Sequence, residues 1–234
     1  MQYLTSNALF RVARIRRNVD GKEIIGTAFF IEHNDREYLI SAKHNFHDQT
    51  NDIDPAVFRD FVVDIETCAG KGKLPLKYII HAADVIAFAT PHRIIHKNYK
   101  VLNSSDTAIL GQDVFIPGFP YGWHMDIKTD EGSGIAPFIK SGCLSAILSD
   151  QRFYIDGFFN KGFSGSPVYF FNAAKKLWSI LGVFTGYHNE RLEMVSDQVG
   201  EIYSNAGFGK GYIIKLILEE IDATISADDE PNSP

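Results

Sequence analysis

A serine with a glycine close on either side is the residue in this chain best suited to chemistry. Residues 161–168 read KGFSGSPV, so Ser164 lies between Gly162 and Gly165. A serine that attacks a carbonyl must stand clear of its own backbone, and main-chain N–H groups must converge on the oxygen that becomes negative. Glycine permits both arrangements because it adopts backbone conformations closed to other residues. The pattern predicts a nucleophilic serine, with a tight non-catalytic turn as the alternative.

A histidine at the end of an apolar hairpin is the candidate general base. Residues 24–31 (IIGTAFFI) and 38–42 (YLISA) are typical of two strands joined by a polar turn, and His44 follows the second. A base held at the end of a rigid strand can accept the serine proton, and imidazole titrates in the required range. His47 raises the alternative of half a metal site, but no second cluster has zinc-like spacing, so no metal is expected.

An aspartate at the start of an apolar strand is the candidate third member of a catalytic triad. Asp84 precedes residues 85–88 (VIAF), and a carboxylate entering such a strand needs a partner, for which orienting an imidazole is a suitable role. Asp106 precedes a similar run and is the rival. We favour Asp84, because the polar residues 103–105 (NSS) before Asp106 are typical of a loop.

Many short strands must position these residues. Apolar and β-branched runs bounded by turn residues predict strands at 9–15, 24–32, 37–42, 60–66, 85–89, 112–118, 144–149, 152–157, 166–171 and 178–184. Residues 211–225 alone show helical spacing of apolar residues. Such a succession of strands that closes on a terminal helix favours an all-β architecture of barrels over a sheet of alternating strands and helices. One folded unit is expected over 1–222, followed by a short acidic, disordered tail at 223–234.

Composition narrows the classes of partner and the compartment. The formal net charge is −6, which provides no general positive field for nucleic acid or an anionic membrane. No apolar stretch reaches the roughly 18 residues that a membrane span needs. Two cysteines, Cys68 and Cys143, are too few for a disulfide framework, and a single disulfide between them is an alternative to two free thiols. We therefore expect a cytoplasmic protein that binds neither nucleic acid nor membrane.

Taken in order, these segments resemble the trypsin-like, or chymotrypsin-fold, serine peptidases, particularly compact bacterial members. The order His44, Asp84, Ser164 distinguishes this family from subtilisins and α/β-hydrolases. Residues 111–120 (GQDVFIPGFP) also match the family's G-x-x-V-x-x-x-G-[FY]-P segment, and residues 181–186 (LGVFTG) are similar to the strand that lines its substrate cleft. The resemblance covers roughly residues 8 to 222.

The resemblance implies a fold and a set of roles. The fold would be two packed six-stranded antiparallel β-barrels with a C-terminal α-helix. Ser164 would be the nucleophile, His44 the base and then the acid, and Asp84 the group that orients His44. The backbone N–H groups of Gly162 and Ser164 would form the oxyanion hole.

The residues implied for substrate binding come from two segments. Six residues before the nucleophile, Phe158 occupies the place where the family has the base of its specificity pocket, so a preference for Lys or Arg is not expected. Phe158 and Phe159 would wall this pocket, or both would be barrel core and Thr185, Gly186 and Tyr187 alone would line it.

The function these features favour is a serine endopeptidase that cleaves protein or peptide substrates without a metal or organic cofactor. The alternatives are a catalytically silent domain that binds a protein partner through the same cleft, and a serine esterase. Besides the protein or peptide substrate, a regulatory protein is the other class of partner considered for such a domain. Residues 70–73 (GKGK) lack the spacing of a phosphate-binding loop, so no nucleotide site is expected.

Overall fold

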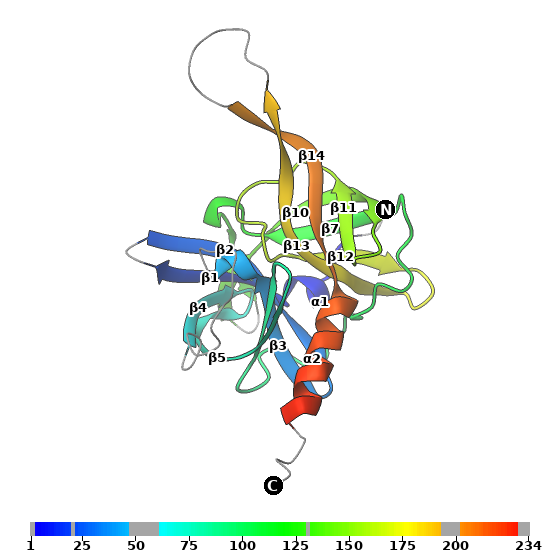
Figure 1. Ribbon diagram of the computed structural model, residues 1–234. Helices are drawn as coiled ribbons and strands as arrows, with labels where there is room; N and C mark the ends of the chain where they lie inside the picture. The colour runs from blue at the N-terminus through cyan, green and yellow to red at the C-terminus, as the bar shows by residue number, and fades with distance from the viewer. Residues whose placement is uncertain (1–2, 20–21, 47–60, 130–131, 193–201, 229–234) are drawn as a thin grey trace.

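The apolar runs of the sequence become the strands of two closed antiparallel barrels (Figure 1). The computed structural model describes residues 3–19, 22–46, 61–129, 132–192 and 202–228. Strands in the first barrel follow the order β1-β2-β3-β6-β5-β4. Their bounds are β1 Val12–Val19, β2 Lys22–His33, β3 Arg36–Ala42, β4 Phe61–Thr67, β5 Gly70–Ala82 and β6 Val85–Ala89. A short helix, α1 (Ser6–Leu9), precedes this barrel.

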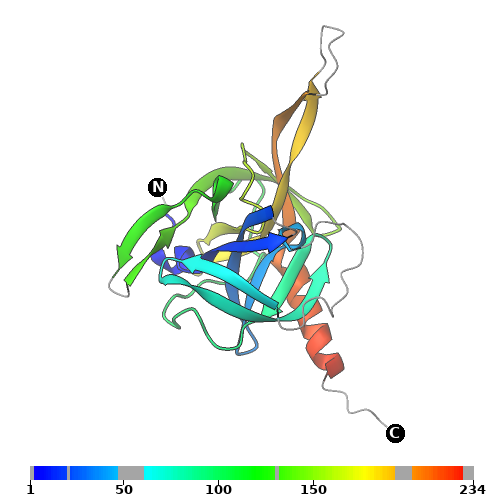
Figure 2. The same cartoon turned by 90° about the vertical axis from the view of Figure 1, so that its left-hand side faces the viewer.

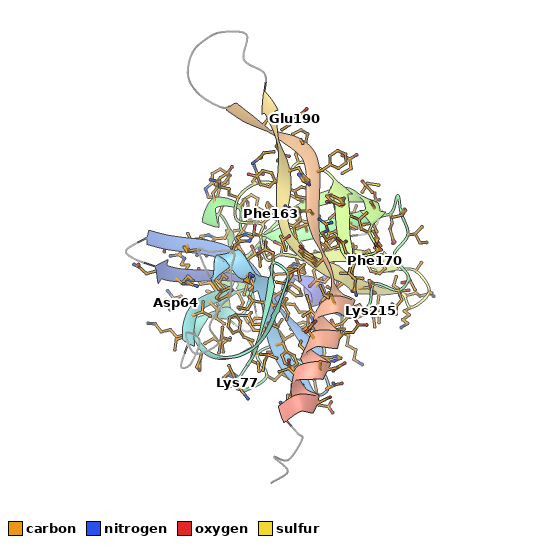
Figure 3. The ribbon with its side chains drawn as sticks, viewed as in Figure 1. Asp64, Lys77, Phe163, Phe170, Glu190 and Lys215 are labelled. Carbon is orange, nitrogen blue, oxygen red and sulfur yellow. The ribbon has the colours of Figure 1, made fainter. Side chains whose placement is uncertain are left out.

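The second barrel follows the order β10-β11-β14-β13-β12-β7. Its strands are β7 Asp113–Gly118, β10 Phe138–Ile147, β11 Arg152–Asp156, β12 Pro167–Asn172, β13 Leu177–Leu192 and β14 Ile202–Ile213. A separate hairpin of β8 (Met125–Thr129) and β9 (Gly132–Ala136) follows β7. The ends of β13 and β14 form an arm that projects from the barrels in both views (Figures 1 and 2). Figure 3 labels Glu190 on this arm, and Phe163 and Phe170, which belong to the core of the second barrel.

The described residues form four clusters of buried side chains. One fills each barrel, a third joins side chains of both barrels, and a small fourth consists of Val12, Phe119 and Ile135. The two faces of β3 lie in different clusters: Leu39 belongs to the core of the first barrel, whereas Tyr38 and Ile40 belong to the cluster that joins the barrels. Helix α2 (Ile214–Asp228) adds Ile214, Ile217 and Ile221, all fully buried, to the joining cluster, so its apolar face covers the contact between the barrels.

The expected all-β fold of two six-stranded barrels and a terminal helix is confirmed, with four strands that the sequence did not predict. These are β5, β8, β9 and β14. Strand β5 contains Pro75, which lies where β5 pairs with β4 but not with β6, and such one-sided positions tolerate proline. Strand β14 contains Gly209 and Gly211, where a Cβ would collide with aromatic rings of the second core.

Smaller differences concern the end of the chain and the cysteines. The sequence placed the helix at 211–225, but β14 continues to Ile213 and α2 runs from Ile214 to Asp228. Helix α2 therefore includes residues 223–228 of the expected tail, and residues 229–234 lie outside the described residues. Cys68 and Cys143 are both free thiols. Within the described residues, no helix is long and apolar enough to cross a membrane.

Candidate active site

The structure brings His44 and Asp84 together at one end of the first barrel. Strands β3 and β6 pair with Ala42 opposite Val85, so the residues just after β3 and just before β6 meet at the same edge. The Nδ1 atom of His44 lies 2.9 Å from Oδ2 and 3.1 Å from Oδ1 of Asp84. Its backbone N–H also donates to Asp84 Oδ1, at 3.3 Å. The carboxylate holds both the ring and the backbone that carries it.

These contacts select one form of the imidazole. A carboxylate only accepts hydrogen bonds, so the proton of a neutral His44 lies on Nδ1 and the lone pair on Nε2. The side chains of His44 and Asp84 are 46% and 36% exposed, so the pair opens to solvent. Asp106 lies in the loop before β7, where its Oδ2 accepts a hydrogen bond from Ser104 at 3.1 Å. Of the two rival aspartates, Asp84 is the one that contacts His44.

Ser164 lies in the loop between β11 and β12, which we call the nucleophile loop (residues 157–166). The Ser164 side chain is half-buried, and its hydroxyl donates to the Thr185 carbonyl of β13 at 3.3 Å. It therefore makes no hydrogen bond to His44 in this structure. A hydroxyl rotates readily between acceptors, and catalytic hydrogen bonds are often absent or long before substrate binds.

Hydrogen bonds from other elements fix the carbonyl groups of this loop. The N–H of Tyr121, in the short helix η3 (Pro120–Gly122), donates to the Lys161 carbonyl at 2.9 Å. The hydroxyl of Thr27 donates to the Gly162 carbonyl at 2.7 Å, and its backbone N–H donates to the Ser164 carbonyl at 3.2 Å. The carbonyls of Lys161, Gly162 and Ser164 are thus held by η3 and by β2, and the Phe163 carbonyl accepts the Ser166 N–H within the loop.

The fixed carbonyls determine where the loop's N–H groups point. In a trans peptide the N–H and C=O groups point in opposite directions, so the bond from Tyr121 to the Lys161 carbonyl turns the Gly162 N–H the other way. Within the loop, the N–H of Gly165 donates to Phe184. Among the described residues, no protein group accepts the N–H of Gly162 or of Ser164. Two unused donors beside the serine are what an oxyanion hole requires.

Two glycines are required by the close approach of this loop to its neighbours. Gly162 and Gly165 have φ of +96° and +87°, in the left-handed region that favours glycine. A Cβ at Gly162 would collide with the Phe119 carbonyl, and one at Gly165 with the carbonyl of Thr27. The glycines around Ser164 are therefore also required by packing, Gly165 against β2 of the first barrel and Gly162 against the segment that follows β7.

Sequence reasoning missed the first-barrel residues that hold this loop. Besides Thr27, the Asn45 amide donates to the Ser164 carbonyl at 2.8 Å and to the Ser41 hydroxyl at 3.1 Å. Asn45 is buried because Gly26 leaves room for it: a Cβ on Gly26 would lie 2.6 Å from Asn45 Cγ. Asn45 directly follows His44, which was the available signal, but its partner is 119 residues away.

The residues predicted to bind substrate separate in the structure. Phe159 is 2% exposed and packs on Phe184, with ring centroids 4.7 Å apart, so it belongs to the second core. The ring of Phe158 is 68% exposed. Thr185 is buried and its carbonyl contacts the Ser164 hydroxyl, whereas Gly186 and Tyr187 follow on β13 and are half-buried. His47, the partner in the alternative metal site, lies outside the described residues.

Comparison with solved structures places the architecture among known proteases. No protein-family model matches the sequence, and no curated protein matches it. The serine endoprotease from Yersinia pestis superposes with a TM-score of 0.61 at 15% identity, over 97% of this chain and 69% of the other. Two structures of the HtrA-type protease AlgW with a tripeptide, one of them a variant, give TM-scores of 0.61 and 0.59 at 18% and 20% identity.

The superposition includes nearly all of this chain but only part of each protease structure. It covers 95% of this chain but only 62% of each AlgW chain, which is less than two thirds of that protein. At these identities the similarity concerns the fold. Together with the two closed barrels of six strands, it shows that the chain has the trypsin-like fold.

Proposed function

We propose that the chain is a serine endopeptidase with His44, Asp84 and Ser164 as its catalytic triad. The observation that carries the proposal is the nucleophile loop, in which the Lys161 and Phe163 carbonyls accept hydrogen bonds from Tyr121 and Ser166 while the N–H groups of Gly162 and Ser164 stay unused beside a serine. A tight turn without catalysis has no need of two unpaired donors next to one hydroxyl. The His44–Asp84 pair is the second support.

The proposed mechanism assigns one task to each group. Nε2 of His44 accepts the Ser164 proton as the hydroxyl attacks the peptide carbonyl, and Asp84 stabilises the imidazolium that forms. The N–H groups of Gly162 and Ser164 bind the oxygen that becomes negative. The imidazolium then protonates the leaving amine, and water hydrolyses the acyl-enzyme by the same steps. None of these steps requires a metal or an organic cofactor.

The substrate is proposed to run beside β13. Beyond Phe184, β13 pairs with β14 only, so its other edge is available there to the acyl side of an extended peptide. The substrate-binding residues proposed on this side are Thr185, Gly186 and Tyr187, with Phe158 as an exposed apolar neighbour. An uncharged side chain is expected before the scissile bond, since none of these four residues offers a carboxylate to a Lys or Arg.

A fluorophosphonate probe tests the proposal without knowledge of the natural substrate. It should modify Ser164, as mapped by mass spectrometry, and Ser164→Ala should abolish both labelling and the cleavage of a fluorescent casein. Ser145→Ala is the matched control, because Ser145 is an exposed serine on β10 and should leave both intact. Unlabelled Ser164 in a folded protein would favour a silent domain that binds a protein partner, and labelling with hydrolysis of esters but not peptides would favour an esterase.

The compartment is part of the same proposal. We place the protein in the cytoplasm, supported by the free thiols of Cys68 and Cys143, since oxidising compartments favour disulfides. Cys68 is buried, which raises the pKa of its thiol to about 11 and keeps it unreactive.

A further inference from the structure

Two exposed aromatic rings lie side by side next to the nucleophile loop. Tyr121 is 57% exposed and Trp123 is 62% exposed, and their ring centroids are 5.7 Å apart. Single exposed aromatics are ordinary on protein surfaces, but a contacting pair that leaves most of both rings in water is a typical recognition feature. We call Tyr121 and Trp123 the aromatic pair.

The backbone under the aromatic pair adopts a conformation that is costly for a bulky residue. Tyr121 has φ 53° and ψ 20°, in the left-handed region, where residues other than glycine, asparagine and aspartate are uncommon. Two hydrogen bonds close the turn around it, from the Gly122 N–H to the Phe119 carbonyl and from the Trp123 N–H to the Pro120 carbonyl. Backbone conformations of this kind persist only where the surrounding structure enforces them, and they cluster at functional sites.

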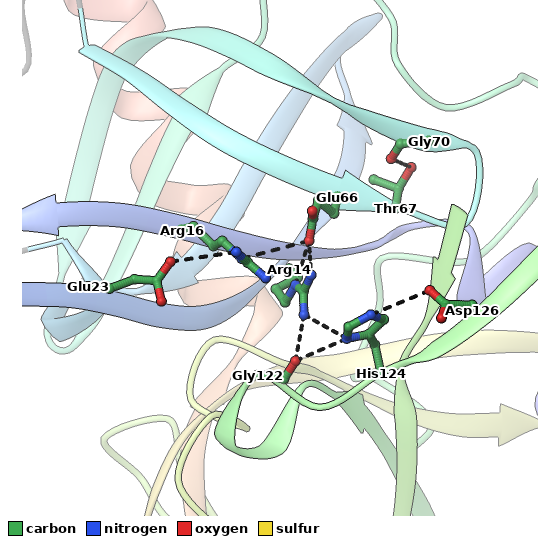
Figure 4. Close-up of polar contacts among 9 residues, drawn as sticks. All are labelled: Arg14, Arg16, Glu23, Glu66, Thr67, Gly70, Gly122, His124 and Asp126. Atoms are coloured by element: carbon green, nitrogen blue, oxygen red, sulfur yellow. Dashed lines mark hydrogen bonds and ion pairs between the residues drawn. The ribbon is translucent and has the colours of Figure 1, made fainter. Parts of the chain in front are cut away.

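A buried arginine of the first barrel bonds to this turn (Figure 4). Nη1 of Arg14 donates to the Gly122 carbonyl at 2.6 Å and lies 2.7 Å from Nδ1 of His124. The same guanidinium forms an ion pair with Glu66 of β4, and its side chain is only 4% exposed. Both sides of Trp123 are therefore anchored, since Gly122 precedes it and His124 follows it. The rings are presented on a rigid base, which lowers the entropy that binding must cost.

The position of the aromatic pair relative to Ser164 identifies what it can contact. The Ser164 hydroxyl contacts the Thr185 carbonyl of β13. The Tyr121 N–H holds the Lys161 carbonyl, three residues before the nucleophile, so η3 borders the nucleophile loop. If the acyl side of a substrate lies along β13, the chain beyond the scissile bond leaves Ser164 in the opposite direction, and η3, which borders the loop, is the element we assign to it.

We propose that the aromatic pair binds the leaving-group side of the substrate and selects an aromatic or other large apolar side chain at the first or second residue after the scissile bond. This inference rests on the proposed peptidase function. The peptide is the occupant that continuity with Ser164 favours, because the pair begins at the residue whose N–H bonds to the nucleophile loop. Large apolar side chains are favoured because the rings offer apolar contact area and stacking.

Kinetics on paired substrates test this selection. Two fluorescence-quenched peptides share one acyl side and carry Phe-Phe or Asp-Gly after the scissile bond, and a third substrate with the same acyl side ends in aminomethylcoumarin. Trp123→Ala should lower kcat/KM for the Phe-Phe peptide, relative to the coumarin amide, by about ten-fold or more. Tyr3→Ala, which removes a ring that is 74% exposed elsewhere, should leave this ratio unchanged. Equal loss on all substrates, or none, would overturn the proposal.

Binding separates this inference from the proposed function. A fluorescein-labelled peptide with a free N-terminal Phe-Phe mimics the leaving product, and its anisotropy reports binding to the Ser164→Ala protein. We expect binding that Trp123→Ala weakens about ten-fold and that an Asp-Gly peptide does not show. If Ser164 never reacts with fluorophosphonate and yet this binding occurs, the peptidase function fails and the peptide site stands. If Ser164 reacts and Phe-Phe binds no better than Asp-Gly, the site fails and the function stands.

Discussion

Removing the hydroxyl of Thr27 tests whether the first barrel positions the oxyanion hole. The Thr27 side chain is fully buried, and its hydroxyl accepts a hydrogen bond from the Phe119 N–H at 3.1 Å while donating to the Gly162 carbonyl at 2.7 Å. Valine has nearly the same shape, so Thr27→Val removes both hydrogen bonds without leaving a cavity. Phe119 and Gly162 would each keep a buried polar group without its partner.

The expected loss follows from these two groups. An unpaired buried donor or acceptor costs about 1–3 kcal/mol, so the free energy of unfolding should fall by about 2–4 kcal/mol after partial relaxation. The Gly162 carbonyl belongs to the peptide group between Gly162 and Phe163, so its relaxation rotates the peptide that lies between the two oxyanion donors. Losing one oxyanion donor outright reduces rate by about 10²–10³. Because the carbonyls of Lys161 and Phe163, which share peptide groups with the two oxyanion donors, keep their own hydrogen bonds, we expect about a ten- to hundred-fold loss of rate.

The assay is the second-order rate of Ser164 phosphonylation by a fluorophosphonate, measured beside urea unfolding at a temperature where every variant is folded. Thr27→Ser retains the hydroxyl and should recover most of the rate, although it also removes a buried methyl group. A Thr27→Val protein that reacts at the wild-type rate would refute the reasoning. A variant that loses stability but not rate would show that Thr27 only holds the barrels together.

Three further outcomes test the site and its surroundings. Asp84→Asn should reduce peptidase kcat by about 10⁴, the loss known for the chymotrypsin triad, because the amide favours the wrong histidine tautomer. Asp106→Asn should leave kcat within about two-fold. The reverse result would make Asp106 the catalytic acid. Gly165→Ala should lower the free energy of unfolding, measured in urea, by about 2–4 kcal/mol, because φ is positive at this position and the new Cβ would collide with its neighbours. Gly72→Ala is the control: its Cβ would meet nothing within 4 Å, so it should lower this free energy by less than about 0.5 kcal/mol. The Cys68 thiol, with its pKa of about 11, should resist iodoacetamide at pH 8 in the folded protein and react once urea unfolds it; fast labelling of the folded protein would contradict its burial.

Local sequence determined the strands that carry the candidate triad. The hairpin before His44 and the strand after Asp84 are continuous apolar runs because both faces of β3 and β6 are buried, one inside the first barrel and one between the barrels. Such runs are visible in a single sequence. The preference for Asp84 over Asp106 came from the polar residues 103–105 before Asp106, and the structure adds that Asp84 adjoins a strand that pairs with the one leading to His44.

Strands rich in glycine, proline and lysine were not visible in this way. In β5, lysines alternate with residues that face the core, and in β14 glycines replace the side chains that would mark a strand. Gly209 and Gly211 are needed because rings from other strands fill the space over them. Their meaning depends on neighbours distant in sequence, which propensity and periodicity do not encode.

The sequence by itself therefore determined the order of the chemical groups and the class of fold, whereas only the tertiary structure decided how the groups are held and what surrounds them. Thr27 and Asn45 bond to a loop more than 100 residues away, so no local pattern could assign them. Phe158 and Phe159 are identical neighbours in sequence, yet one ring is 68% exposed and the other 2%. Burial of this kind arises from packing between strands, because each side chain's environment is set by residues brought close only when both barrels have closed.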